Sequence, residues 1–226
     1  MIPACIGVIM DGNRRWAKKR GLPPLEGHKK GYETLKETIR WARDAGVQSL
    51  IFYAFSTENW NRTAEEVSYL MDIFRAALRD EIETVAGEGA RVRFLGTRER
   101  LSQDIQGMMS DIEERTKDKK DFTLGIALSY GGRAEILSVA RKMCLEQNSE
   151  KNIREKDFEK NLWTAGIPDP DIIIRTGGEK RLSNFLPWQS VYSELFFTDT
   201  FWPDFSKKEF EKILSEFGER ERRRGR

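Results

Sequence analysis

The segment Ile6-Gly7-Val8-Ile9-Met10-Asp11-Gly12-Asn13-Arg14-Arg15-Trp16-Ala17-Lys18-Lys19 decides how this chain is interpreted. Its apolar first half is rich in β-branched residues and too short for a core helix, so it predicts a buried strand. An acid and a glycine end the strand, and a basic segment able to form a helix follows at once. Ligands of open α/β sheets bind at the carboxyl ends of the strands. We therefore expect Asp11 on the ligand-binding edge of a sheet.

The residues around Asp11 indicate what that edge binds. Gly12 permits a sharp turn and a close approach of the backbone to a ligand, and Asn13 is suited to cap the next helix. Positive charge follows from Arg14, Arg15, Lys18 and Lys19. One carboxylate among cations is typical of a magnesium–diphosphate site, with the metal on Asp11 and the phosphate oxygens on the cations. Alternatively, Asp11 only caps a helix and the cations form a solvated face.

Composition limits the class of protein. The 226 residues fit one α/β domain, and 39 basic against 37 acidic residues argue against bulk nucleic-acid binding. Cys5 and Cys144 stand far apart in apolar contexts and predict reduced core residues of a cytosolic protein. His28 is the one histidine of the sequence, which argues against a zinc site built from several histidines and against a Ser-His-Asp triad. No apolar run approaches the roughly 20 residues of a membrane span, and no secretory signal is apparent.

Strands and helices alternate along the chain. Further strands are predicted at 49–55, 91–95, 122–128, 171–174 and 191–198. Helices are predicted over 27–44, after Thr63, from Ser102 to 112, over 133–143 and after Ser206, with loops at 21–24 and about 147–156. The alternation implies right-handed crossovers and a mostly parallel, six-stranded sheet flanked by helices, in one domain spanning 1–226.

Polar clusters follow four of the predicted strands, and a parallel sheet places these clusters on one edge. The cluster after the 171–174 strand is expected to face Asp11 through Arg175, Arg181 and Ser183. The pair at 177–178 is glycine, which allows a tight turn that offers backbone N–H groups to an anion. Alternatively, the two arginines make surface ion pairs with Glu179 or Asp171.

Three further features have two interpretations each. His28 is a capping or core histidine, or a ligand. Trp60 is a packed loop aromatic, or part of a site. The helix face that carries Leu70, Phe74 and Leu78 belongs to the core, or lines a tunnel for an apolar substrate.

Five blocks taken together resemble the cis-prenyltransferase family. They are Met10-Asp11-Gly12-Asn13-Arg14-Arg15-Trp16-Ala17, Gly27-His28-Lys29-Lys30-Gly31, Tyr53-Ala54-Phe55-Ser56-Thr57-Glu58-Asn59-Trp60-Asn61-Arg62, Ile174-Arg175-Thr176-Gly177-Gly178-Glu179 and Arg181-Leu182-Ser183-Asn184-Phe185. The blocks stand in the family's order and span nearly the whole chain. No single block would be as specific.

The resemblance implies a homodimer with a six-stranded parallel sheet and an apolar tunnel beside it. It implies Mg²⁺-dependent condensation of isopentenyl diphosphate with an allylic prenyl diphosphate, each step making a cis double bond. The product is then a longer polyprenyl diphosphate. Nucleic acid is not an expected partner. The expected localisation is cytoplasmic, with a peripheral membrane contact for product release left open.

The resemblance also implies roles for individual residues. Asp11 is expected to be catalytic and to hold magnesium, Asn59 matches the position usually assigned as proton acceptor, and Glu194 matches a second metal ligand. Substrate-binding positions are Gly12, Asn13, Arg14, Arg15, Trp16, His28, Ser56, Thr57, Glu58, Trp60, Arg62, Arg175, Arg181, Leu182, Ser183, Arg223 and Gly225. The basic tail, residues 219–226, is expected to reach the diphosphate of the dimer partner.

One position departs from the family pattern. Where members usually carry an arginine four residues before the histidine, this chain has Pro24, and Arg14 is the nearest replacement. We expect an altered choice of allylic substrate. The alternatives are a different acceptor or a condensation other than head to tail, a non-catalytic subunit, and a phosphate-binding module without turnover.

Overall fold

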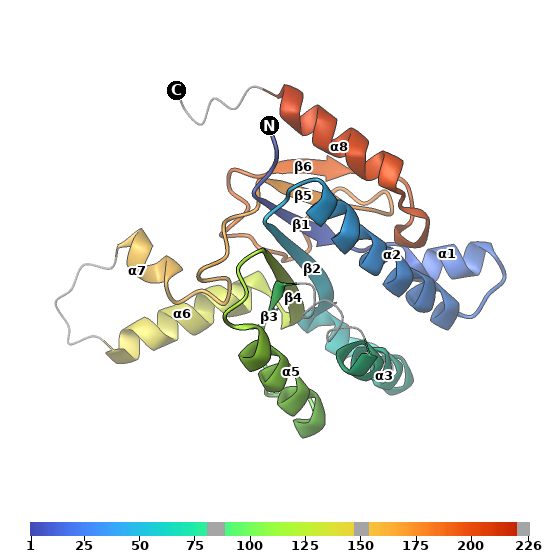
Figure 1. Ribbon diagram of the computed structural model, residues 1–226. Helices are drawn as coiled ribbons and strands as arrows, with labels where there is room; N and C mark the ends of the chain where they lie inside the picture. Colours follow the sequence, from blue (N-terminus) through green and yellow to red (C-terminus); the bar gives the residue numbers. More distant parts are fainter. Residues whose placement is uncertain (81–88, 147–153, 221–226) are drawn as a thin grey trace.

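A sheet of six parallel strands runs through the middle of the molecule (Figure 1). The computed structural model describes residues 1–80, 89–146 and 154–220. The strands are β1 (Cys5–Ile9), β2 (Ser49–Ser56), β3 (Ala90–Leu95), β4 (Phe122–Tyr130), β5 (Ile172–Arg175) and β6 (Glu194–Phe197). Their order is β3-β4-β2-β1-β5-β6. The predicted fold class is therefore confirmed, and every strand pair is parallel.

Helices cover both faces of the sheet. They are α1 (Asn13–Lys19), α2 (Pro24–Asp44), α3 (Ala64–Asp80), α5 (Gln103–Thr116), α6 (Gly132–Glu146), α7 (Glu155–Glu159) and α8 (Lys207–Glu219), with short 3₁₀ helices η1 (Thr57–Asn61) and η2 (Trp202–Asp204). Apolar side chains of α2, α8 and η2 pack on one face, and α3 and α5 continue that layer towards β3. Segments that follow β4, including α6, cover the opposite face.

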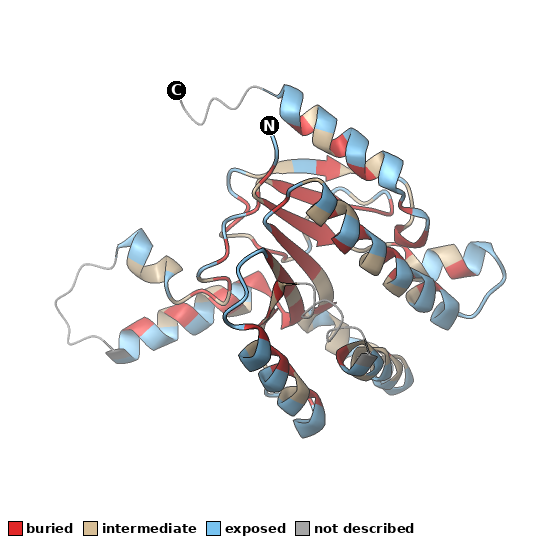
Figure 2. Cartoon of the chain, in the orientation of Figure 1, coloured by how far each residue is buried: buried red, intermediate tan, exposed pale blue. Residues whose placement is uncertain are grey.

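Strand β1 lies near the centre of the sheet, hydrogen-bonded to β2 on one side and β5 on the other. All five of its residues are buried (Figure 2). A strand that is covered on both faces needs an unbroken apolar sequence, which explains why Cys5–Ile9 does not alternate. Asp11 follows two residues after the strand and stands at the carboxyl edge of the sheet, as predicted.

Helices α1 and α2 pack unusually close together because glycines face α1. A Cβ atom on Gly27 would lie 2.0 Å from the backbone oxygen of Asn13, and one on Gly31 would lie 2.3 Å from its side-chain oxygen. Only glycine allows this approach. The indole N–H of Trp202 also donates to the Gly31 carbonyl at 2.7 Å. The two helices and η2 therefore form one packed unit beside Asp11.

Strand β3 is an edge strand, and two of its outward N–H groups are satisfied by α5. Val92 N donates to Thr116 Oγ1 at 3.1 Å, and Phe94 N donates to Glu113 Oε1 at 2.8 Å. Unpaired edge groups invite pairing with another chain. Side chains of α5 block that pairing at this margin of the sheet.

The structure corrects several predicted details. Helix α2 begins at Pro24 rather than Gly27, because proline suits the first turn of a helix, where no backbone N–H is needed. Strand β6 is limited to Glu194–Phe197, and the preceding residues form a turn. Cys144 is exposed, so only Cys5 is a core cysteine. Among the described residues, no helix has the length and apolar character that a membrane span requires.

Candidate functional site

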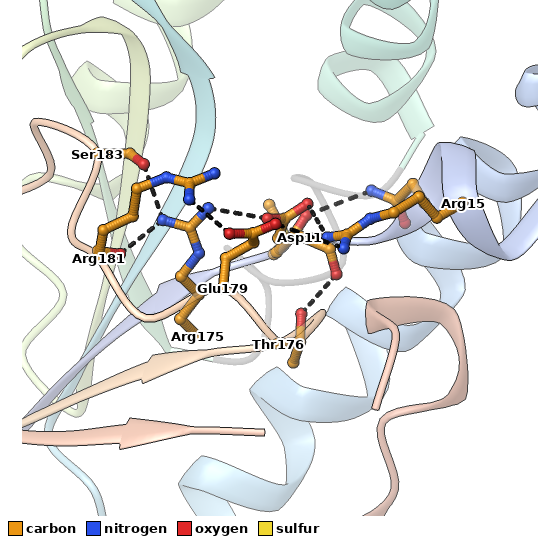
Figure 3. A network of polar contacts seen from close by, with 9 residues as sticks. Asp11, Arg15, Arg175, Thr176, Glu179, Arg181 and Ser183 are labelled. Atoms are coloured by element: carbon orange, nitrogen blue, oxygen red, sulfur yellow. Dashed lines mark hydrogen bonds and ion pairs between the residues drawn. The ribbon is translucent and has the colours of Figure 1, made fainter. Parts of the chain in front are cut away.

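Asp11 is the centre of a polar network at the carboxyl edge of the sheet (Figure 3). Its carboxylate is 3.0 Å from Arg15 Nη2 and 2.8 Å from Arg175 Nη2. Its backbone carbonyl accepts hydrogen bonds from Thr176 Oγ1 at 2.7 Å and from Trp202 N at 3.0 Å. The position of Asp11 is thus fixed from α1, from β5 and from η2.

Arg175, at the end of β5, is the most buried cation of the network, with 4% of its surface exposed. Its Nη1 donates to Ser183 Oγ at 2.8 Å and to the Arg181 carbonyl at 2.5 Å. These bonds aim the guanidinium at Asp11. The predicted meeting of Arg175 and Ser183 with Asp11 is confirmed as geometry.

Two further carboxylates neutralise the neighbouring arginines. Glu179 lies 3.8 Å from Arg15 and 2.5 Å from Arg181 (Figure 3). Glu66, in the first turn of α3, lies 3.3 Å from Arg14 and 2.8 Å from Arg62. The arginines at this edge are held in place by acids that an anionic ligand would have to replace.

Two cavities meet at Asp11. The first, of about 560 Å³, is lined by Met10, Asp11, Gly12, Asn13, Arg14, Arg15, Lys18, Leu22, Pro24, His28 and Arg62. The second, of about 600 Å³, is lined by Ile9, Met10, Asp11, Asn13, His28, Tyr53, Ala54, Ser56, Glu58, Asn59, Arg62, Leu70, Arg175, Ser183 and Asn184. Both share Met10, Asp11, Asn13, His28 and Arg62. The arrangement has room for two anionic ligands side by side.

His28 lies between the cavities and is neutral at ordinary pH. The pKa of its imidazole is lowered to about 4, chiefly by burial and also by the positive charges of Arg62 and Arg14, against the opposing effect of Glu66. Its Nε2 atom is buried and has no hydrogen-bond partner among the described residues. His28 therefore offers an unpaired nitrogen at the point where both cavities meet.

The loop after β2 is ordered by its own side chains. Asn59 Oδ1 accepts a hydrogen bond from Ser56 N at 3.0 Å, and the Ser56 side chain caps the η1 turn in return. Across the second cavity, Ser183 and Asn184 both adopt positive φ angles, 49° and 67°. Such backbone is strained in non-glycine residues and often occurs at functional sites. Asn184 Nδ2 donates to Glu58 Oε1 at 2.9 Å and joins the two loops.

Some predicted site residues line neither cavity; they are Trp16, Thr57, Trp60, Arg181 and Leu182. Trp16 donates its indole N–H to Asp204 at 2.7 Å and stacks under Arg20, which anchors α1 to η2. Trp60 donates to Ser129 Oγ at 2.9 Å and packs on Phe55. These two tryptophans position the loops that carry the site.

Two expectations about the carboxyl edge of the sheet are wrong, and a third concerns residues that the structure does not describe. Backbone N–H groups of Gly177 and Gly178 donate to the carbonyls of Thr200 and Thr198, so they are not free for an anion. Gly12, rather than Asn13, stands at the N-cap of α1, and no side chain caps that helix. Residues Arg223 and Gly225 lie outside the described residues.

Glu194 is not brought to Asp11 within one chain. It opens β6 and is level with Ile172 and Ile6 at the amino end of the sheet, five residues before Asp11 along β1. At about 3.3 Å per strand residue the two carboxylates are separated by on the order of 15 Å along the sheet. Glu194 instead lies 2.5 Å from Arg220, near the start of the basic tail.

The donor set at Asp11 fits a magnesium ion that is shared with a substrate. No group of three His, Cys, Asp or Glu side chains in the described part of the chain could enclose a metal. Mg²⁺ is usually held by one or two carboxylates together with substrate phosphates and waters. A single carboxylate on the wall of both cavities matches that pattern.

Sequence reasoning did not single out three polar residues of the site, Tyr53, Glu66 and Asn184, whereas the ion pair of Arg181 with Glu179 was one of its alternatives and is present. The Tyr53 hydroxyl lies 3.2 Å from the Ser183 carbonyl, and burial raises the pKa of this phenol. The Glu66 side chain accepts hydrogen bonds from two arginines, Arg14 and Arg62. The available signal for Glu66 was charge, because it follows Arg62, the last residue of a recognised block, by four residues.

Comparison with known proteins agrees with this geometry. Residues 9–225 match a family model described as putative undecaprenyl diphosphate synthase. An isoprenyl transferase of Thermotoga maritima is 46% identical over 99% of this chain and 97% of its own length. A (2E,6E)-farnesyl-diphosphate-specific ditrans,polycis-undecaprenyl-diphosphate synthase of Legionella pneumophila is 45% identical, over 99% of this chain and 96% of its own.

Solved structures that resemble this chain are also prenyl diphosphate synthases. Lavandulyl diphosphate synthase from Lavandula x intermedia, in complex with dimethylallyl diphosphate, superposes with a TM-score of 0.94 at 34% identity, covering 100% of this chain and 99% of that one. A probable undecaprenyl diphosphate synthase from Campylobacter jejuni superposes with a TM-score of 0.83 at 31% identity, covering 99% of each chain. These matches extend over nearly the whole chain, and the chain belongs to the undecaprenyl diphosphate synthase family of prenyltransferases.

Proposed function

We propose that this prenyltransferase condenses isopentenyl diphosphate with an allylic prenyl diphosphate and releases a longer Z-polyprenyl diphosphate. The observation that carries the proposal is the pair of cavities that meet at Asp11. The allylic diphosphate occupies the first cavity, beside Arg14, Arg15 and Arg62. Isopentenyl diphosphate occupies the second, beside Arg175 and Ser183. The reacting carbons then lie between them.

Departure of the allylic diphosphate is the step that needs stabilisation. It leaves a delocalised carbocation and a leaving group with several negative charges. Arginines that already lie at the diphosphate position stabilise that charge with little reorganisation. Holding both reactants in adjoining cavities contributes up to about 7–11 kcal/mol of the barrier. Neutral His28 adds a hydrogen-bonding group at the same point without adding charge.

Asp11 is the residue that would hold magnesium together with the diphosphate oxygens. The ion supplies Lewis-acid stabilisation of the departing diphosphate. Glu194 joins a metal site only if a second chain brings it there, because it lies at the opposite end of the sheet from Asp11. The same homodimer would deliver the tail residues Arg223 and Gly225.

The proton lost in each condensation needs an acceptor. An amide is a very weak base, and Asn59 Oδ1 already accepts from Ser56 N. We therefore assign the proton to a diphosphate oxygen. Asn59 acts as a positioning residue that holds η1 against the second cavity.

The growing hydrocarbon must leave water, at about 0.8 kcal/mol for each buried CH₂ group. Leu70 of α3 lines the second cavity, and Phe74 packs in the apolar cluster between α3 and α5. A tunnel along α3 is the route that we propose for the chain.

The direct test incubates the protein with isopentenyl diphosphate, Mg²⁺ and, in turn, dimethylallyl, geranyl, farnesyl and geranylgeranyl diphosphate. Mass spectrometry gives product length, and NMR gives double-bond geometry and connectivity. We expect head-to-tail products with new cis double bonds. Absence of product with every allylic substrate would favour a non-catalytic subunit or a phosphate-binding module.

Asp11→Asn tests the role of the central carboxylate. The amide keeps a hydrogen-bond acceptor for buried Arg175 but loses the negative charge, so we expect turnover to fall about 100-fold or more with the fold intact. Steady-state rates and thermal unfolding measure the two effects. Glu33→Gln, an exposed acid on α2, is the control. Near-normal turnover would remove Asp11 from the mechanism.

A second candidate is a preference for a short allylic substrate. The neighbour at a TM-score of 0.94 was solved with dimethylallyl diphosphate. Pro24, which lines the first cavity, offers neither charge nor a backbone donor. We expect Pro24→Arg to shift kcat/KM towards longer allylic diphosphates. An unchanged ranking of substrates would show that Pro24 does not set it.

A further inference from the structure

The turn that joins α1 to α2 projects from the edge of the molecule (Figure 1) and is exposed throughout (Figure 2). Every residue from 18 to 26 is exposed, and we call this segment the outer turn. It carries two leucines, Leu22 and Leu25, with 40% and 39% of their surfaces open to solvent. Apolar side chains on a projecting turn gain nothing from the core of this chain.

The outer turn is surrounded by positive charge. Residues 14–30 contain seven lysines and arginines and one acid, Glu26. Arg20 and Lys30 are paired with Asp204 and Glu33. In the described part of the chain, no carboxylate pairs with the remaining lysines of this surface: Lys18, Lys19 and Lys29. Unpaired lysines beside exposed leucines are the combination that an anionic lipid surface attracts.

The outer turn also forms part of the mouth of the first cavity. Lys18, Leu22 and Pro24 line that cavity together with Asp11 and His28. A surface that covered the turn would therefore lie at the opening through which a ligand of the first cavity passes.

We propose that the outer turn docks this protein on an anionic lipid bilayer, with Leu22 and Leu25 in the interface and the lysines among the headgroups. Free phosphate would engage the lysines but would leave the leucines in water. The meaning of the docking rests on the proposed function, since a prenyl diphosphate with a long hydrocarbon tail resides in membranes. Vesicle binding is measured without substrate, so its result is independent of whether the protein catalyses the proposed condensation.

The experiment is co-sedimentation with vesicles of phosphatidylcholine containing 30% phosphatidylglycerol, compared with pure phosphatidylcholine. We expect binding to the anionic vesicles that weakens as salt is raised. Leu25→Ser should reduce the partition coefficient about tenfold. The double variant Lys19→Gln/Lys29→Gln should reduce it about fivefold per lysine. None of these three residues lines either cavity.

Matched controls carry the same substitutions elsewhere. Leu145→Ser changes an exposed leucine of α6, and Lys119→Gln/Lys120→Gln changes two exposed lysines before β4. Both should bind anionic vesicles like the unmodified protein, and thermal unfolding confirms that all variants fold. The proposal is overturned if the unmodified protein does not bind anionic vesicles. It is overturned equally if the outer-turn variants bind as well as their controls, or if inorganic phosphate alone abolishes binding at constant ionic strength.

Discussion

At the scale of single residues, the site is a set of arginines already paired with acids. Glu179 spans Arg15 and Arg181, and Glu66 spans Arg14 and Arg62. A diphosphate that enters must displace these carboxylates. The acids preserve the geometry of the guanidinium groups at the cost of some affinity for the anion.

Glu179→Gln should therefore bind inorganic pyrophosphate more tightly. Removing one negative charge at about 4 Å in a solvated site is worth about 1 kcal/mol, or roughly a fivefold lower Kd. Calorimetric titration measures it, with Glu37→Gln, which pairs with Arg40 on the exposed face of α2, as the control. Weaker binding by the variant would show that Glu179 organises the arginines for the ligand rather than competing with it.

His28 should make stability depend on pH in a defined window. Its pKa is about 4 in the folded chain and 6.5 when exposed, so the unfolded chain takes up a proton first as the pH falls. The contribution of His28 is complete above pH 6.5 and is lost between 6.5 and 4, by up to about 3 kcal/mol. Urea unfolding of the unmodified protein and His28→Asn over this range isolates the effect. Parallel pH curves for the two proteins would contradict it.

At the scale of elements, the close contact of α1 and α2 depends on glycine. Gly27→Ala places a methyl group 2.0 Å from the Asn13 carbonyl, a backbone atom that cannot rotate away. We expect a loss of about 1–3 kcal/mol in the free energy of unfolding and weaker pyrophosphate binding. Gly107→Ala in α5 meets no atom within 4 Å and should instead gain about 0.5–1 kcal/mol. Equal effects of the two substitutions would refute the packing argument.

The elements also show what sequence alone could predict. Uninterrupted apolar runs gave the buried strands, and the acid after β1 gave the site edge, because periodicity and sheet topology determine both. Long-range backbone hydrogen bonds could not be predicted: Gly177 donates to Thr200 and Gly178 to Thr198, which lie about twenty residues later in the chain. The hydrogen bond from Trp16 to Asp204, which anchors α1 to η2, could not be predicted for the same reason, since Asp204 is distant in sequence.

At the scale of the whole molecule, the site of one chain is expected to be completed by another. Asp11 stands at the carboxyl end of the sheet, whereas Arg220, the last described residue, forms an ion pair with Glu194 at the amino end. If the tail acts in trans, mixing Asp11→Asn with Arg223→Ala chains creates mixed dimers that each hold one intact site.

Such a mixture should recover on the order of a quarter of the unmodified activity after subunit exchange. Isopentenyl diphosphate incorporation measures the recovery, and unmixed variants are the baseline. The pair Asp11→Asn with Glu194→Gln should behave alike if Glu194 also crosses to the partner. Activity no greater than the average of the parents would show that each chain completes its own site, without residues from the partner.

The glycine-mediated contact of α1 with α2 has a mechanical consequence. The hairpin holds Asp11's neighbours at one end and the projecting leucines at the other, and its tight seam lets little movement be absorbed between them. A displacement of the outer turn is therefore transmitted to the part of α1 and α2 that lies beside Asp11. If the outer turn docks as proposed, we expect turnover measured beside lipid to differ from turnover measured in dilute buffer.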